Sequence, residues 1–148
     1  MYEISLVPFG YLHTVLPAIT PFLDRSEFWS HGRSSIDDII KFLYTGQMHL
    51  WVVYEGEFEQ MHAYLITEIK QYPQAKMFTI QYCAGDPGVL KASGSKVFST
   101  MESAARDSKC AGIEFFGRPG WGQYVKEFGC TVQTVVYEKH FTDEVKEE

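Results

Sequence analysis

Residues 76–129 constrain the fold most, because they predict a strand, a turn, a helix, a second strand and a short helix in that order. Residues 77–84 are apolar or aromatic on both faces, which is typical of a strand covered on both sides, and the turn residues 85–88 end it. Residues 95–108 repeat apolar side chains at helical spacing, and residues 111–117 predict a short buried strand. A strand, a crossover helix and a strand favour a parallel pair.

The short helix that ends this unit has a clear apolar face. Trp121, Tyr124, Val125 and Phe128 follow one another at the spacing of helical neighbours, and Gly129 stands where a helix C-terminus favours glycine. This pattern predicts a helix that packs on the preceding strand.

The N-terminal part predicts a strand and an irregular helix. Residues 2–9 alternate as a short edge strand that Pro8 ends, because proline donates no ladder hydrogen bond. Residues 11–23 keep helical phase, but Pro17 and Pro21 predict a kinked or broken helix. Residues 24–33 are expected to form a loop.

The remaining segments predict a helix, a hairpin and a last strand. Ser35 and Asp38 form a capping-box pattern before a helix that Gly46 ends. Residues 48–54 and 61–69 predict an antiparallel hairpin around a turn at residues 55–57. Residues 131–141 alternate as a final strand, so we expect one domain at residues 1–142, followed by an acidic tail at residues 143–148.

Composition narrows the class of protein. The chain of 148 residues suits a single domain, and its net charge of −6 without a Lys/Arg run argues against a nucleic-acid groove. The three cysteines form no Cys-x-x-Cys motif and the five histidines show no metal-ligand spacing, so we expect no metal site. No apolar run approaches the roughly 18 residues of a membrane span. We expect a soluble protein that is cytoplasmic or carried in a virion.

The order of these elements resembles the GNAT superfamily of acetyl-CoA-dependent N-acyltransferases over nearly the whole chain. The more specific parts are the glycine-containing loop before the long helix and residues 117–130, whose Arg-x-Gly-Trp form is similar to divergent GNAT-like proteins of bacteriophages. The resemblance implies an α/β (α+β) fold, with a mixed, mostly antiparallel sheet flanked by helices. It also implies that the strands at residues 77–84 and 111–117 splay apart.

The resemblance also implies where acetyl-CoA would bind. Pantetheine would pair with the splayed strand, and the pyrophosphate would meet the start of the helix, because the first helical N–H groups lack partners. Lys91 would add a point charge. The residues implied to contact the cofactor are Tyr82, Cys83, Ala84, Lys91, Gly94, Ser95 and Lys96. The loop departs from the family pattern, since residues 91–96 keep one glycine and place lysine at both ends.

Acetyl transfer needs a base for the amine and an acid for the leaving thiolate. Glu68 and Glu114 are the candidate bases, although a strand glutamate is more often a solvated surface group. Tyr124 is the candidate acid; it lies one residue before the family's usual tyrosine position, which is Val125 here. Trp121 and Arg118 are candidate substrate contacts, with core packing and loop closure as the alternatives.

Two hypotheses follow from these residues. In the first, the chain is a small N-acetyltransferase that acts on a small amine or a protein amine. In the second, the fold has lost catalysis and serves as a virion-associated or self-assembling protein, with the aromatic segment at residues 22–29 as its contact surface. The departures in the loop and at Val125 favour the second hypothesis, whereas Gly94 and the element order favour the first.

Overall fold

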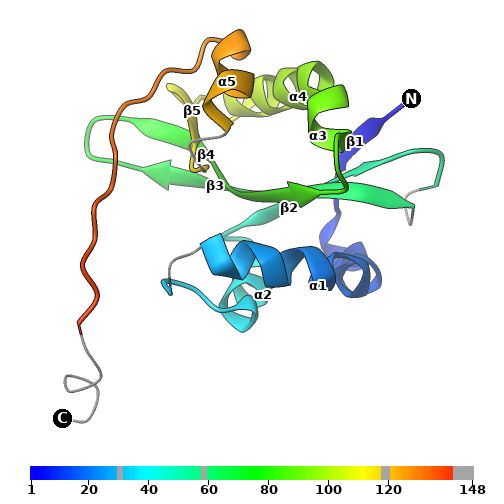
Figure 1. Cartoon of the computed structure of the whole chain (residues 1–148). Helices are drawn as coiled ribbons and strands as arrows, with labels where there is room; N and C mark the ends of the chain where they lie inside the picture. Colours follow the sequence, from blue (N-terminus) through cyan, green and yellow to red (C-terminus); the bar gives the residue numbers. More distant parts are fainter. Residues whose placement is uncertain (30–31, 58–59, 118–120, 142–148) are drawn as a thin grey trace.

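A computed structural model describes residues 1–29, 32–57, 60–117 and 121–141, with residues 24–29 described through their backbone alone. Five strands form one sheet in the order β1-β2-β3-β4-β5, and helices cover both faces (Figure 1). The strands are β1 (Glu3–Leu6), β2 (His49–Tyr54), β3 (Met61–Gln71), β4 (Lys76–Gly85) and β5 (Gly112–Phe115). β1 to β4 pair antiparallel and β4 pairs with β5 in parallel, which confirms the predicted fold class and the parallel pair.

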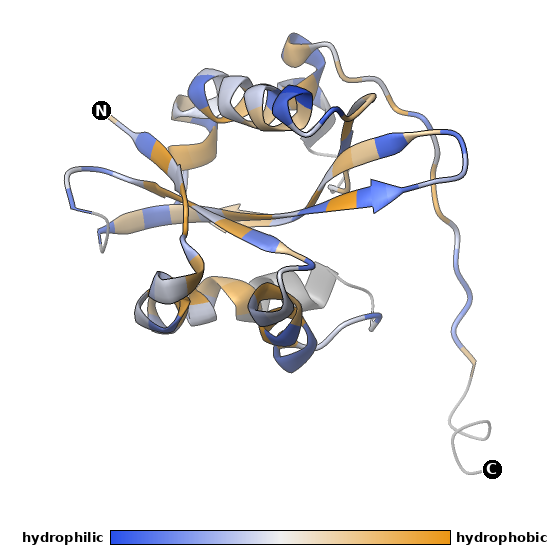
Figure 2. Cartoon of the chain, turned by 180° about the vertical axis from the view of Figure 1, so that it is seen from behind, coloured by the Kyte–Doolittle hydropathy of each residue, from blue (hydrophilic) through white to orange (hydrophobic). Residues whose placement is uncertain are grey.

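Helices α1 (Leu12–Trp29) and α2 (Ile36–Thr45) cover one face, which we call the α1/α2 face. Helices α3 (Val89–Ala92) and α4 (Gly94–Asp107) cover the other, the α3/α4 face. The short helix α5 (Gly122–Val125) and the 3₁₀ turn η3 (Lys126–Phe128) lie over α4, and a further 3₁₀ turn, η1 (Phe9–Tyr11), precedes α1. Hydrophobic residues line the sides of these layers that face one another (Figure 2).

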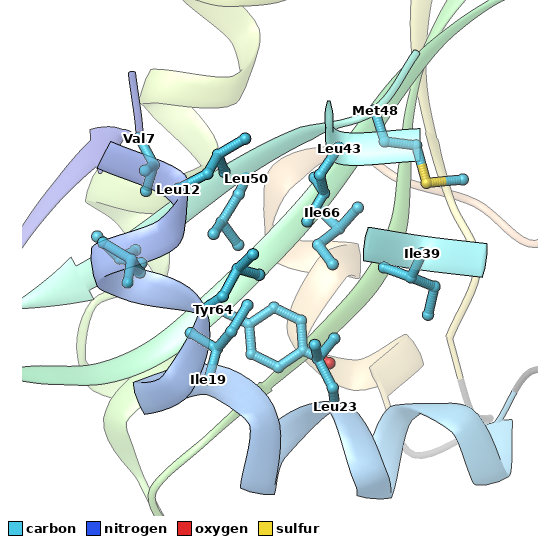
Figure 3. Close-up of a cluster of buried hydrophobic side chains, with 13 residues drawn as sticks. Val7, Leu12, Ile19, Leu23, Ile39, Leu43, Met48, Leu50, Tyr64 and Ile66 are labelled. Atoms are coloured by element: carbon cyan, nitrogen blue, oxygen red, sulfur yellow. The ribbon is translucent and has the colours of Figure 1, made fainter. Parts of the chain in front are cut away.

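Each face has its own apolar core. On the α1/α2 face, Ile19, Leu23, Ile39, Leu50 and Ile66 meet around Tyr64 (Figure 3). The core of the α3/α4 face is built from buried side chains of β2, β3, β4 and both helices: Trp51, Val53, Ala63, Leu65, Phe78, Ile80, Val89, Val97, Met101 and Ala105. The sheet is therefore covered on both sides through β2, β3 and β4.

The capping signals are confirmed. Ser35 Oγ accepts the Asp38 N–H, and the Asp38 carboxylate accepts the Ser35 N–H, which is a complete capping box. Gly46 has φ of +81° and Gly129 has φ of +87°, so both glycines adopt the left-handed conformation expected at a helix end.

The broken helix and the loop at residues 24–33 are corrections. α1 runs without interruption through Pro17 and Pro21 to Trp29. Burial of Leu16, Ile19 and Leu23 offsets the lost backbone bonds, and the Thr20 hydroxyl donates to the Leu16 carbonyl at 2.9 Å. Residues 30 and 31 of the expected loop lie outside the described residues.

The final strand is also a correction. Residues 131–141 form no strand in the described structure and are exposed throughout. Their alternating sequence favours a strand, but an isolated strand needs a partner to satisfy its backbone. The predicted tail at residues 143–148 lies outside the described residues.

Candidate active site

A β-bulge in β4 shapes the candidate site. Ile66 pairs with Tyr82 and Thr67 pairs with Ile80, so Gln81 is an extra residue on β4. A bulge bends its strand and increases the local twist. The β4–β5 pairing stops at the same place: Ile80 pairs with Phe115, and the Phe116 N–H donates to the Ile80 carbonyl at 3.2 Å.

Beyond Ile80, no described residue of β5 pairs with β4. Residues 82–85, which we call the β4 end segment, continue to pair with β3 on their other side. Tyr82 and Ala84 pack against the core of the α1/α2 face, and Cys83 packs against the core of the α3/α4 face. This segment therefore turns one backbone edge away from β3, next to the end of β5.

The two candidate bases lie on the α1/α2 face of the sheet. Glu68 pairs with Thr79 across β3 and β4, and Thr79 pairs with Glu114 across β4 and β5. Paired residues on neighbouring strands point to the same face. Phe78 and Ile80, on either side of Thr79, belong to the opposite core, so this row of three side chains faces α1 and α2.

Hydrogen bonds hold the two carboxylates differently. Glu68 accepts the Gln47 amide on Oε2 at 2.9 Å and the Gln81 amide on Oε1 at 3.2 Å. Glu114 accepts the buried Thr79 hydroxyl at 2.8 Å and the Tyr72 hydroxyl at 3.0 Å, both on Oε2. Within the described part of the chain, Glu114 Oε1 is therefore left to accept a further donor.

The surroundings of the Tyr72 phenol change its pKa. Partial burial, the hydrogen bond to Glu114 and the charges of Glu114 and Glu68 raise the pKa of the Tyr72 phenol above its ordinary value. The phenol therefore stays protonated and keeps donating to Glu114. Sequence reasoning missed Tyr72, Thr79 and the two glutamines. Thr79 and Gln81 left a signal there, as polar residues inside the apolar run at residues 77–84.

On the α3/α4 face, aromatic contacts join α5 to α3. The rings of Phe115 and Trp121 lie 5.6 Å apart between centroids, and those of Trp121 and Tyr124 lie 5.9 Å apart. Lys91 Nζ lies 6.0 Å from the centroid of the Tyr124 ring. The structure thus brings Lys91, Trp121 and Tyr124 together beside Phe115, the last residue of β5.

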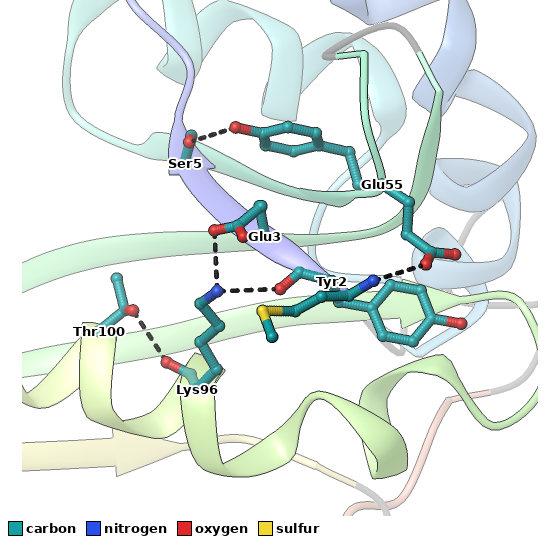
Figure 4. Close-up of polar contacts among 8 residues, drawn as sticks. Tyr2, Glu3, Ser5, Glu55, Lys96 and Thr100 are labelled. Atoms are coloured by element: carbon teal, nitrogen blue, oxygen red, sulfur yellow. Dashed lines mark hydrogen bonds and ion pairs between the residues drawn. The ribbon is translucent and has the colours of Figure 1, made fainter.

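The other predicted cofactor residues lie elsewhere on α4. A Cβ atom on Gly94 would meet the Phe128 ring at 3.5 Å, so η3 covers this glycine. Ser95 is exposed on the first turn of α4. Lys96 Nζ donates to the Glu3 carboxylate at 2.8 Å and to the Tyr2 carbonyl at 3.1 Å, at the β1 edge of the sheet (Figure 4).

Ser93 joins α3 to α4. The Ser93 N–H donates to the Val89 carbonyl at the end of α3, and the Val97 N–H donates to the Ser93 carbonyl at the start of α4. Arg118 lies outside the described residues. The described residues contain no group of three or more His, Cys, Asp or Glu side chains that could hold a metal ion.

An apolar hollow of about 120 Å³ lies away from this region. It is lined by residues of η1, α1, α2 and β2 and of the turns beside them, among them Val7, Leu12, Leu43 and Leu50. No helix in the described ranges has both the length and the apolar character needed to cross a membrane.

No protein-family model and no curated protein sequence matches the chain. Solved structures do match. A GCN5-related N-acetyltransferase from Ralstonia eutropha JMP134 superposes with a TM-score of 0.69 at 14% identity, covering 95% of this chain and 99% of that one. Glucosamine-6-phosphate N-acetyltransferase from Arabidopsis thaliana superposes with a TM-score of 0.63 at 13% identity, covering 96% and 99%.

A predicted acetyltransferase from Clostridium acetobutylicum, solved with acetyl-CoA, superposes with a TM-score of 0.66 at 12% identity, covering 95% of this chain and 96% of that one. These matches extend over nearly the full length of each structure. At such low identity they show a common fold. The chain therefore has the fold of the GNAT acetyltransferases.

Proposed function

We propose that this chain transfers an acetyl group from acetyl-CoA to an amine, with Glu114 as the general base. The observation that carries the proposal is the position of Glu114 on β5, one residue before the last pair with β4, with Oε2 bonded to Thr79 and Tyr72. The shared fold and the acetyl-CoA in the Clostridium structure support the same reaction.

The β4 end segment fits a pantetheine arm, because no described residue of β5 pairs with it. The side of a strand that has no neighbouring strand can bind the amides of an extended ligand, as in strand addition. Tyr82, Cys83 and Ala84 belong to this segment. Lys91 would meet a phosphate beside Tyr124, whereas Lys96 is bound to Glu3 and Gly94 is covered by Phe128.

Residues on the two faces of the sheet have different roles in the proposed reaction. Bound acetyl-CoA supplies the acetyl group as a thioester. On the α1/α2 face, Glu114 Oε1 accepts the proton that the amine nitrogen loses as it forms the new N–C bond, while Glu68 adds negative charge that favours a cationic acceptor. On the α3/α4 face, Tyr124 is the side chain that we assign to protonate the thiolate released when the C–S bond breaks.

Thermal unfolding with acetyl-CoA tests the binding step. At about a hundredfold excess over its Kd, a ligand that binds only the folded state adds roughly 2.7 kcal/mol to the free energy of unfolding. We expect Lys91→Ala to reduce this stabilisation more than Lys96→Ala does. Lys41→Ala is the matched control, because Lys41 is an exposed lysine on α2 in the opposite layer.

The outcomes separate the hypotheses. A stabilisation that Lys91→Ala weakens and Lys41→Ala leaves intact supports the proposed site. If Lys96→Ala has the larger effect, the phosphates bind at the start of α4 instead. An absence of stabilisation by acetyl-CoA overturns the proposal and leaves a scaffold without catalysis as the remaining hypothesis.

A further inference from the structure

One lysine lies on the same face of the sheet as the two candidate bases. Lys70 follows Glu68 by two residues on β3, and alternation along a strand places both side chains on the α1/α2 face. Tyr72, two residues beyond Lys70, donates to Glu114 at 3.0 Å. Lys70 therefore stands in the chain between one of the two carboxylates and the phenol that binds the other.

The Lys70 ammonium lies against an aromatic ring at the end of β5. Its Nζ is 5.0 Å from the centroid of the Phe116 ring, which is a cation–π contact. Phe116 follows Glu114 by two residues, and the Phe116 N–H donates to the Ile80 carbonyl, where the pairing of β4 with β5 stops. The contact thus holds an amine against the first residue beyond the last β4–β5 pair.

This amine has no carboxylate partner within the ranges that the structure describes. Lys96 forms an ion pair with Glu3 at 2.8 Å, whereas the half-buried Lys70 forms none with a described residue. A single cation–π contact is weak and the lysine stem is flexible, so Nζ can leave the Phe116 ring for a reacting group nearby. Glu114 Oε1, which accepts no hydrogen bond from a described residue, lies on the same face.

We propose that Lys70 is itself an acceptor of the acetyl group, and that each chain acetylates its own Lys70 from the acetyl-CoA bound where β4 and β5 separate. This inference rests on the proposed function, because it uses the same cofactor and the same base. It adds a modification site, and it identifies a lysine side chain as one amine that this face accepts.

The transfer to Lys70 balances in atoms and protons. The ammonium first loses one proton to water, and the lone pair of Nζ then attacks the carbonyl carbon of the thioester. Glu114 Oε1 takes the second proton as the N–C bond forms, and Tyr124 protonates the thiolate that the broken C–S bond releases. Proton exchange with water restores both side chains, so the products are acetylated lysine, the free thiol of CoA and one proton.

The test incubates the full chain with acetyl-CoA and follows the acetylation of each lysine by peptide mass spectrometry. Lys41, an exposed lysine on α2, is the internal reference for uncatalysed reaction with acetyl-CoA. We expect Lys70 to be acetylated faster than Lys41, at a rate per chain that does not depend on protein concentration. Glu114→Gln should slow the acetylation of Lys70 by about 10²–10⁴-fold and leave that of Lys41 unchanged.

A charge-conserving variant separates acetylation from binding. Lys70→Arg keeps a cation for the Phe116 ring, but a guanidinium stays protonated and does not attack the thioester. This variant should gain no acetyl group at residue 70, while acetyl-CoA still raises its melting temperature. Lys41→Arg, the matched control, should keep both the acetylation of Lys70 and the thermal stabilisation.

Each other outcome overturns the inference. Thermal stabilisation by acetyl-CoA without faster acetylation of Lys70 than of Lys41 overturns it and leaves the proposed function standing. A rate that rises with protein concentration also overturns it, because the transfer would then occur between chains. An unchanged rate at Lys70 in Glu114→Gln would mean that this site does not catalyse the reaction. An absence of stabilisation by acetyl-CoA overturns the proposed function and this inference together.

Discussion

The two faces of the sheet are packed alike at their centres and differ at the β4–β5 end. Each face has its own buried apolar core. Where β4 and β5 separate, the α1/α2 face carries Glu68 and Glu114, whereas the α3/α4 face carries Trp121, Tyr124 and Lys91. Stability is thus shared between the faces, but the proposed chemistry is not: the face with the two carboxylates would suit a cationic acceptor, and the face with Lys91 and the aromatic rings would suit an anionic, partly apolar cofactor.

The largest expected effect tests this division at the carboxylates. Glu114→Gln keeps the shape of the side chain but removes the proton acceptor, so we expect kcat/KM for acetyl transfer to fall by about 10²–10⁴-fold. Glu68→Gln should cost less, because both oxygens of Glu68 already accept glutamine amides. Steady-state kinetics of the two variants, with melting temperatures as the control for folding, measure the difference.

The opposite ranking would move the base to Glu68. Equal, small losses in both variants would mean that neither carboxylate takes the proton, and the chemical division between the faces would then fail.

Core substitutions test the claim that stability is shared. Leu50→Ala on the α1/α2 face and Ile80→Ala on the α3/α4 face each truncate a side chain that is 1% exposed, and each should reduce the free energy of unfolding by about 2–5 kcal/mol. Leu6→Ala is the control: Leu6 is 45% exposed, so its loss should stay near about 0.5 kcal/mol. Urea denaturation measures all three. A cost confined to one face would show that a single core holds the fold.

A smaller effect concerns the cap of α2. Ser35→Ala removes the side-chain oxygen that accepts the Asp38 N–H, and we expect a loss of about 1 kcal/mol in the free energy of unfolding. Ser35→Asn should restore most of it, because asparagine also caps helix N-termini. If neither change alters urea denaturation, packing alone fixes the start of this helix.

The same cap has a pH dependence. The hydrogen bonds from Ser35 lower the pKa of the Asp38 carboxyl below its ordinary 3.8. A carboxyl whose pKa is lowered by folding adds stability above its unfolded pKa, and this contribution disappears as pH falls through the folded value. The stability difference between the wild type and Asp38→Asn should therefore shrink below about pH 3.8. A difference that stays constant there would contradict the role of the charge.

The smallest effect concerns Tyr72. Because its pKa is raised from 10.0 by partial burial, by its bond to Glu114 and by the nearby carboxylates, folding favours the protonated phenol. Its contribution is present below pH 10 and is lost as pH rises through the folded pKa. In a spectrophotometric titration, the difference between wild type and Tyr72→Phe should show one tyrosine that ionises above pH 10. Ionisation at pH 10 or below would contradict the hydrogen bond to Glu114.

The predicted break of the helix at Pro17 and Pro21 did not occur, for a reason outside the local sequence. Each proline costs about 3 kcal/mol inside a helix, and that local cost favours a break. Ile19 and Leu23 are fully buried in the core of the α1/α2 face, which only the sheet makes available. The predicted strand at residues 131–141 failed for the opposite reason. Its alternating pattern favours a strand locally, but a strand also needs a partner strand, which the local sequence does not provide.

Short-range rules were enough for the parts that the sequence determined. The Ser35 cap, the left-handed glycines at 46 and 129, the hairpin and the α4 periodicity all depend on residues a few positions apart, which is the range over which caps, turns and helical faces form. The tertiary structure alone decided which residues share a face at the candidate site. The extra residue Gln81 shifts the alternation of β4, so that Thr79 and Tyr82 face the same side, and strict alternation along the sequence would have separated them. A bulge depends on pairing with another strand, and the sequence pattern of β4 alone does not contain it.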